Sequence, residues 1–216
     1  MNAKSKKITT LAMLSAIAYI LMVVGRIPVV LFLKYDPKDV IITIGGFIFG
    51  PLSAFVVSTI VSLIEMFTVS DTGFIGFVMN VIATCSFACL AAYIYKCHHS
   101  LKGAIIGLIS GCLLMTGIML LWNYLITPLY LKVPRSEVIK LLVPALLPFN
   151  LLKGGLNATL TILLYKPLVT SLRKTNLIPE SKKDTGSSKI NTGVMLISAL
   201  ILITCILIVL VLNKTI

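Results

Sequence analysis

Long apolar runs separated by short polar segments dominate this chain, and they predict a bundle of membrane-crossing helices. A span needs about 20 apolar residues to cross roughly 30 Å of hydrocarbon, and its backbone groups must be hydrogen-bonded internally, which favours helices. The first run is interrupted by Gly25-Arg26-Ile27-Pro28. Six stretches predict the helices of an all-α membrane protein: 8–33, 40–49, 52–68, 74–95, 103–129 and 141–169.

Gly50 and Pro51 divide an apolar run that is too long for one crossing. Proline after glycine breaks a helix, so we predict a short helix over 40–49 and a longer one over 52–68. The short helix reaches only about 15 Å. Because it cannot cross the bilayer alone, we expect one of its ends to border a polar cavity or a buried loop.

A polar segment and another apolar run follow this six-helix core. Residues 176–190 have the lysines, serines and glycine of a flexible linker. From Thr192 to Leu212 the chain is apolar and uncharged, which predicts a seventh transmembrane helix that anchors or packs. We therefore expect a membrane domain over 1–175 and an extra C-terminal helix within 191–216.

The composition excludes several other classes of protein. The 216 residues are 58% hydrophobic and 12% charged, with a mean hydropathy of +1.05. Soluble domains are roughly 45–50% apolar and 25% charged. The chain is too hydrophobic to be disordered, and its five cysteines do not make a disulfide scaffold.

The net charge of +12 reflects membrane topology, because the basic residues lie between the apolar runs. The positive-inside rule and anionic lipid account for them, so nucleic acid is not an expected partner. We predict a multi-pass protein of the cell membrane with a cytoplasmic N-terminus. Eleven of the 19 Lys and Arg residues then lie inside: Lys4, Lys6, Lys7, Lys96, Lys102, Lys166, Arg173, Lys174, Lys182, Lys183 and Lys189. Lys38 falls among those predicted to lie outside.

Polar groups at membrane depth are the candidates for function. A charge near the bilayer centre costs about 2.5–3.5 kcal/mol unless it is paired or faces water. Arg26, Glu65 and Lys153 either pair with one another to hold helices together or form a ligand pocket. Asn150 and Lys153 are three residues apart, so a helix places them on one face. An amide beside an ammonium suits an uncharged hydrogen-bonding ligand as well as an anion.

Further amides and a polar turn extend this candidate pocket. Asn80 and Asn123 either line it or bond to a neighbouring helix. The turn from Lys34 to Asp39 precedes the short helix, where Asp39 is placed to act as the N-cap. The turn can also form a lid, with Tyr35 stacked on a flat ring.

Stripes of small residues predict close helix contacts. We expect Gly103, Gly107 and Gly111 to pack inside the protein, whereas Ala12 and Ala16 either pack or face a partner. The chain has no nucleophile–base pair, metal-binding pattern or phosphate loop that we can identify. We therefore expect neither an enzyme nor a cofactor, and any ATP-driven step requires another subunit.

Taken together, several segments resemble the riboflavin-specific substrate-binding (S) component of energy-coupling factor (ECF) transporters. They are 34–39 (KYDPKD), 45–51 (GGFIFGP), 76–80 (GFVMN), 123–124 (NY) with 128–130 (PLY), and 148–154 (PFNLLKG). The resemblance runs from about residue 8 to 174. It implies a six-helix bundle with both ends in the cytoplasm and an outer vitamin pocket that a loop covers.

The resemblance also implies site residues and partners. Riboflavin would be the transported ligand, and a transmembrane coupling (T) subunit with two ATPase subunits would drive transport. Ala12 and Ala16 match positions that face the coupling subunit. With Asn123 from the quoted segments, the implied pocket residues are Lys34, Tyr35, Asp36, Asp39, Glu65, Asn80, Asn123, Asn150 and Lys153.

The chain departs from the family pattern at two places. Family members often have Ser-Asp-x-Pro where this chain has residues 38–41, and a neutral amide can stand in place of Glu65. Two alternatives stay open. One is an S component for another vitamin, such as thiamine or a biotin-like acid. The other is an ion-coupled secondary transporter that uses Glu65 and Asp39 as carriers.

Overall fold

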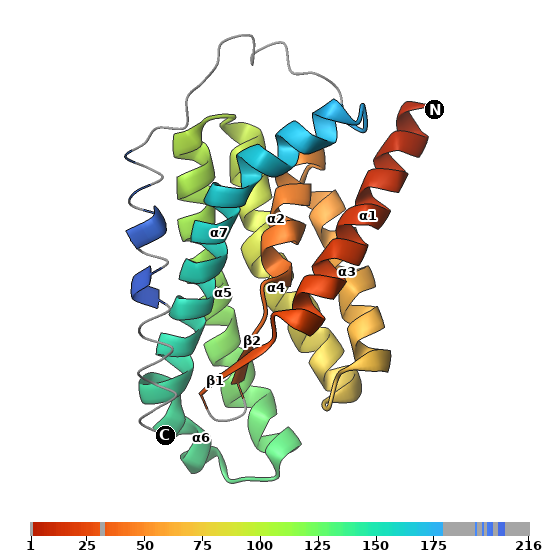
Figure 1. The fold of residues 1–216 in the computed structure, drawn as a ribbon. Helices are drawn as coiled ribbons and strands as arrows, with labels where there is room; N and C mark the ends of the chain where they lie inside the picture. Colours follow the sequence, from red (N-terminus) through yellow and green to blue (C-terminus); the bar gives the residue numbers. More distant parts are fainter. Residues whose placement is uncertain are drawn as a thin grey trace.

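A bundle of long helices with a small β-hairpin at one end forms the protein (Figure 1). The computed structural model describes residues 2–30, 33–178, 193, 196, 198–200 and 203–205. Its elements in chain order are α1 (Ala3–Val24), β1 (Ile27–Val30), β2 (Leu33–Tyr35), α2 (Lys38–Phe49), α3 (Pro51–Thr68), α4 (Gly73–Cys97), α5 (Leu101–Leu131), α6 (Arg135–Leu141), the π-helix η1 (Leu142–Leu146) and α7 (Leu147–Lys174).

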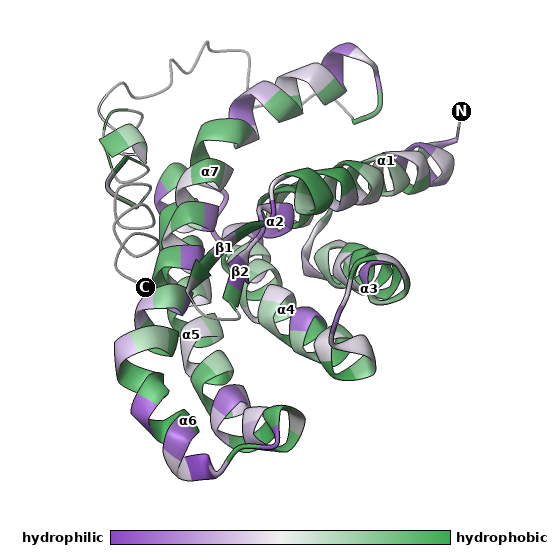
Figure 2. Cartoon of the chain, turned by 60° about the horizontal axis from the view of Figure 1, so that its bottom comes forward, coloured by the Kyte–Doolittle hydropathy of each residue, from purple (hydrophilic) through white to green (hydrophobic). Residues whose placement is uncertain are grey.

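The helices have the length and the surface of membrane spans. Among the described residues, large apolar side chains such as Leu52, Phe67 and Leu129 point outward, and Figure 2 shows hydrophobic residues along the outer helices. A surface of this kind suits lipid and would aggregate in water. In the part of the chain that the structure describes, five stretches are long and apolar enough to cross a membrane: Ala3–Val24, Pro51–Thr68, Gly73–Cys97, Leu101–Leu129 and Arg135–Lys174.

The short helix α2 lies at the centre of the bundle, packed against α1, α3, α4 and α7. Its twelve residues extend about 18 Å, and those from Lys38 to Phe47 are all buried. Gly50 separates it from α3 with a φ of 92°, which favours glycine. The predicted break at Gly50 is therefore confirmed, and Asp36, two residues before the buried start of α2, lines a cavity.

The first apolar run does not form the single interrupted helix that we predicted over 8–33. Helix α1 ends at Val24, and the chain continues into the antiparallel strands β1 and β2, in which Ile27 is opposite Tyr35. Pro28 has no amide proton for a helical bond, and its β-branched neighbours favour a strand. The apolar pattern alone could not separate these two structures.

Helices α4 and α5 approach closely along the predicted glycine stripe. A Cβ added at Gly111 would lie 2.5 Å from the carbonyl oxygen of Phe87, and one at Gly107 would lie 2.8 Å from that of Ala91. No side chain fits there without moving the helices apart. The prediction of internal packing is therefore confirmed at Gly107 and Gly111.

The described residues between 193 and 205 are helical, in agreement with the predicted extra helix. The other residues of the predicted segment 191–216 lie outside the described part of the chain. The same is true of 179–190 in the predicted linker. The domain boundaries at 175 and 190 therefore stay predictions.

Candidate ligand-binding site

A cavity lies at the hairpin end of the bundle, among β2, α3, α4, α5 and α7. It has about 1130 Å³ of atom-free space, part of it open to the surroundings. Concave sites that combine apolar side chains with a few polar groups are typical of small-molecule binding. Charged groups, amides and apolar side chains share its wall: Arg26, Leu33, Lys34, Asp36, Glu65, Ser70, Asp71, Thr72, Ile75, Gly76, Met79, Asn80, Ala83, Met115, Met119, Trp122, Asn123, Ile126, Thr127, Phe149, Asn150 and Lys153.

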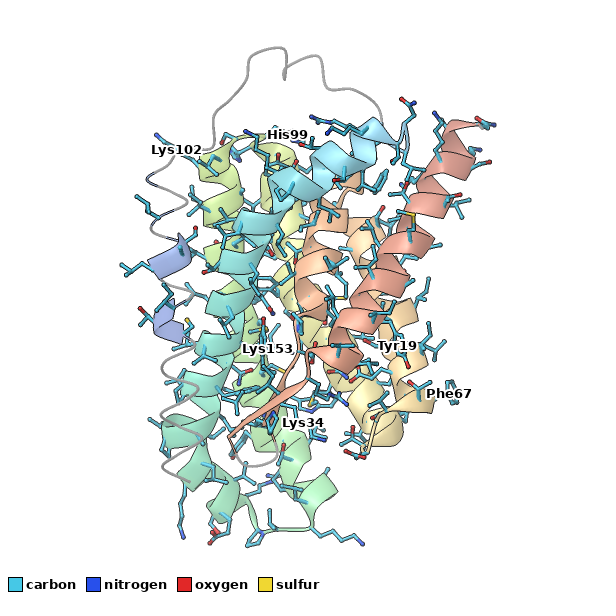
Figure 3. The ribbon with its side chains drawn as sticks, in the orientation of Figure 1. Tyr19, Lys34, Phe67, His99, Lys102 and Lys153 are labelled. Carbon is cyan, nitrogen blue, oxygen red and sulfur yellow. The ribbon has the colours of Figure 1, made fainter. Side chains whose placement is uncertain are left out.

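Most of the residues predicted from the sequence meet at this cavity, although they come from distant parts of the chain. Figure 3 shows Lys34 on the hairpin and Lys153 on α7 toward the same end of the bundle. Seven of the nine predicted pocket residues line the cavity: Lys34, Asp36, Glu65, Asn80, Asn123, Asn150 and Lys153. Tyr35 and Asp39 are not on its wall.

Glu65 is the centre of a buried charge network. One carboxylate oxygen accepts a hydrogen bond from Arg26 Nη2, and the other accepts from Lys38 Nζ and from Asn80 Nδ2 at 3.0 Å. These partners come from the start of the hairpin, from α2 and from α4. The two cations compensate the cost of burying the carboxylate, so ion pairing explains the charge of Glu65 at this depth.

Lys153 is held by two carboxylates at the base of the cavity. Its ammonium lies 3.5 Å from Asp39 Oδ2 and 3.8 Å from Asp36 Oδ2. Asp36 is also 4.0 Å from the Lys38 ammonium. Because the Arg26, Lys38 and Lys153 cations stand against Asp36, Asp39 and Glu65, this network has no net charge. We call these six residues the floor network.

Asp36 precedes α2 and lies outside the spanning helices. Burial alone would raise the pKa of its carboxyl group, but the ammonium groups of Lys153 and Lys38 hold that pKa below its usual range. The Asp36 carboxylate therefore stays ionised and keeps the Lys153 ammonium in place at neutral pH.

Asp39 supports the cavity from beneath and does not cap α2. Pro37 occupies the N-cap position, with no side-chain cap hydrogen bond, so the predicted capping role of Asp39 is wrong. Its carboxylate instead accepts hydrogen bonds from Thr84 Oγ1 at 2.6 Å and from Asn157 Nδ2 at 3.1 Å. Asp39 thereby joins α2 to α4 and α7.

Tyr35 also lies off the cavity wall, and its stacking on a flat ring stays a prediction. Its side chain is buried among Val29, Phe149 and Leu152, and its hydroxyl donates to Asn157 Oδ1 at 3.1 Å. Lys38, which we predicted to lie on the outer side of the membrane, is fully buried and paired with Glu65.

Two amides of the cavity wall, Asn150 and Asn123, are bonded within their own helices, whereas Asn80 bonds to Glu65 of α3. Asn150 Nδ2 donates to the Leu146 carbonyl, and Asn123 Nδ2 donates to the Met119 carbonyl, both at 2.7 Å. Asn123 Oδ1 also accepts from Thr127 Oγ1 at 2.9 Å. An asparagine side chain offers two N–H donors and an acceptor oxygen with two lone pairs. Both side chains therefore keep hydrogen-bonding capacity for a ligand.

Sequence reasoning missed the apolar wall and one buried amide. Met79, Met115, Trp122 and Phe149 supply flat or flexible apolar surface that looks in the sequence like any other core. Asn157 follows Lys153 by one helical turn, and that spacing could have revealed it.

Comparisons with known proteins place the chain in one class of membrane transporter. The family model "ECF transporter, substrate-specific component" matches residues 6–165. A solved structure, described as "Structure and mechanism of the S component of a bacterial ECF transporter", has a TM-score of 0.65 and 32% identity. The match covers 79% of this chain and 99% of that one.

Two relatives of this chain are named riboflavin transporters. The riboflavin transporter RibU of Staphylococcus aureus is 32% identical over 181 residues, which cover 79% of this chain and 94% of the relative. The riboflavin transporter FmnP of Bacillus subtilis is 32% identical over 164 residues, which cover 70% and 85%. The chain therefore belongs to the substrate-specific components of ECF transporters. It is a transporter subunit and not an enzyme.

Proposed function

We propose that this chain binds riboflavin at the outer face of the cell membrane and delivers it inward as part of an ECF transporter. The observation that carries the proposal is the convergence of charged groups and amides with an apolar wall in one cavity. The named relatives that share about a third of the sequence are riboflavin transporters.

The cavity suits the chemistry of a flavin. Riboflavin has a flat, largely apolar ring system with a polar imide edge and a chain of hydroxyl groups. Trp122, Phe149 and the methionines offer surface for the ring, while Asn150 and Lys153 can bond to its polar edge. The charged wall residues balance, which suits an uncharged ligand: Arg26, Lys34 and Lys153 against Asp36, Glu65 and Asp71.

An ion-coupled transporter is disfavoured by the state of the two carboxylates that it would use. Glu65 is bound by Arg26, Lys38 and Asn80, and Asp39 is bound by Lys153, Thr84 and Asn157. A carboxylate that carries a proton or an ion must exchange its partners during each cycle, and breaking a buried pair is costly. Both residues serve the architecture of the pocket instead.

The remaining parts of the proposal concern partners and orientation. Ala12 and Ala16 are exposed on α1, and we assign them to the contact with the coupling subunit, which would bring two ATPase subunits. Lys102 lies at the end of the bundle opposite Lys34 (Figure 3). By the positive-inside rule, the Lys102 end faces the cytoplasm together with the N-terminus, and the cavity faces outward.

Identification of the co-purified ligand tests the proposal directly. Protein extracted in mild detergent should carry a yellow ligand with the absorption and mass of riboflavin. Ligand-free protein should bind riboflavin in titrations and bind neither thiamine nor biotin. Preferential binding of thiamine or biotin would overturn the assignment.

A variant of Lys153 then tests the site. Lys153→Ala should weaken flavin binding by about 1–3 kcal/mol, because it leaves ligand acceptors unpaired. Lys102→Ala, an exposed lysine at the opposite end, is the matched control and should bind as the wild type does. Equal affinity of Lys153→Ala and wild type would remove the assigned pocket.

Uptake in cells should stop on ATP depletion, and uptake that depends on an ion gradient would favour a secondary transporter.

A further inference from the structure

The C-terminal part of the chain is additional to the shared fold. The family model ends at residue 165, and the solved S component is matched over 99% of its own length but over only 79% of this chain. The described residues between 193 and 205, which we call the C-terminal segment, lie beyond the matched family model. They are helical and lie beside α7 in both ribbon views (Figures 1 and 2).

Among the described residues of the C-terminal segment, Ser198 and Cys205 face the bundle, while Leu196, Leu200 and Ile203 face away from it. Ser198 is 4% exposed and Cys205 is partly buried, and the two are seven residues apart, on one helix face. Leu196, Leu200 and Ile203 are 63%, 65% and 55% exposed. In membranes, small residues at a helix contact allow close approach, while large apolar residues face lipid. The pattern is that of a docked transmembrane helix.

Helix α7 has a matching gap at Gly155. A Cβ built on Gly155 would be 3.8 Å from Cys205 Sγ, an ordinary van der Waals contact. The preceding residue, Gly154, faces α5. A Cβ added there would lie 2.3 Å from the Cys112 sulfur. Gly154 therefore allows the close approach of α5, whereas Gly155 leaves a small space on the side of α7 that Cys205 faces.

The contact continues into the wall of the cavity. Cys205 packs against the apolar cluster formed by Val29, Tyr35, Ala145, Phe149, Leu152 and Leu156. Val29 and Tyr35 belong to the hairpin, and Phe149 lines the cavity. This cluster joins the hairpin to α7, and the C-terminal segment covers part of it.

We propose that the C-terminal segment is a docked helix of this chain that holds the hairpin cluster against α7 and slows release of the ligand from the cavity. The occupant of the Gly155 face of α7 is thus a segment of the same polypeptide. The docking is inferred from the contacts of Cys205 with α7 and with the hairpin cluster. The effect on ligand release also rests on the proposed function.

Disulfide trapping tests the docking independently of any ligand. Gly155→Cys is combined with the native Cys205, with the four other cysteines replaced by alanine and a protease site inserted within 181–189. After oxidation and cleavage, the C-terminal fragment should stay attached until a reductant is added. The matched control combines Gly155→Cys with Cys205→Ser and Ile203→Cys, which points outward, and its fragment should be released. Release in the test variant would overturn the docking, and so would attachment only to a second copy.

Flavin release tests the effect on the cavity. Cys205→Phe should accelerate release by about fivefold or more, the lower end of typical coupling between sites. Gly155→Leu, which fills the same gap from α7, should do likewise, whereas Ile203→Phe should release flavin at the wild-type rate. Wild-type rates in both test variants would overturn the retention role. If the wild type binds no flavin, the proposed function and the retention role both fall, while the trapping result still decides the docking.

Discussion

The floor network and the amides of the cavity wall use polarity in different ways. The charges of the floor network are paired with one another, most of them beneath or at the base of the cavity. Asn150 and Asn123 on the wall are bonded mainly to their own helices and keep capacity for a ligand. The contrast indicates that the charges fix the architecture while the neutral amides recognise the ligand, with Lys153, which also lines the cavity, taking part in both. Substitutions in each group should therefore change different quantities.

The largest expected effect is on stability, from Lys38→Met. Removal of this fully buried cation leaves the Glu65 carboxylate short of a partner, which should cost about 3–5 kcal/mol of folding free energy. Thermal unfolding in detergent measures the loss. The double variant Lys38→Met/Glu65→Gln removes both charges and should recover part of it. A stability of the single variant equal to that of the wild type would show that the network does not hold the fold.

Asn150→Ala should weaken flavin binding and change stability little, in contrast to Lys38→Met. Loss of the amide leaves a buried flavin group without a partner, and we expect a decrease of about 1–3 kcal/mol in binding free energy. Flavin titration and thermal unfolding of the same preparation separate the two effects. A large drop in melting temperature with unchanged affinity would place Asn150 with the structural residues and break the contrast.

Tyr35→Phe tests a residue that lies between the two groups. It removes the hydrogen bond from the Tyr35 hydroxyl to Asn157 but keeps the ring in its apolar cluster. We expect a loss of about 1 kcal/mol in stability. Because the hydroxyl is not on the cavity wall, equilibrium flavin affinity should change much less than in Asn150→Ala. A comparable loss of affinity would show that Tyr35 contacts the ligand after all.

Lys34→Ala should have the smallest effect on stability. Its ion pair with Asp71 is exposed, and exposed pairs contribute roughly 0–1 kcal/mol. The melting temperature should stay close to that of the wild type, in contrast to Lys38→Met four residues later. A destabilisation as large as that of Lys38→Met would contradict the distinction between exposed and buried pairs.

The features that could be predicted from the sequence are those set by local chemistry. Gly50 and Pro51 break the helix wherever they stand, and the glycine stripe of α5 allows close packing with any partner. The strand at 27–30 could not be separated from a helix, because a short apolar stretch satisfies both structures. Its place in a hairpin depends on pairing with residues 33–35.

Most of the pocket residues predicted from the sequence line the cavity, but the ion pairs and hydrogen bonds among them could not be predicted. A charge or amide at membrane depth is costly, which is why Glu65, Asn80, Asn150 and Lys153 stand out from the sequence alone. Which of them bind one another depends on the packing of α2 among four helices. Lys38 therefore seemed to belong to a surface turn, although the fold buries it completely.

The position of Glu65 has a consequence for any movement of the hairpin. Arg26 directly precedes β1 and Lys38 follows β2 by three residues, so the two roots of the hairpin are fastened to one side chain of α3. Arg26 is fixed further by the Val69 carbonyl. Because one carboxylate holds both roots, loss of the Glu65 charge would loosen the two ends of the hairpin together.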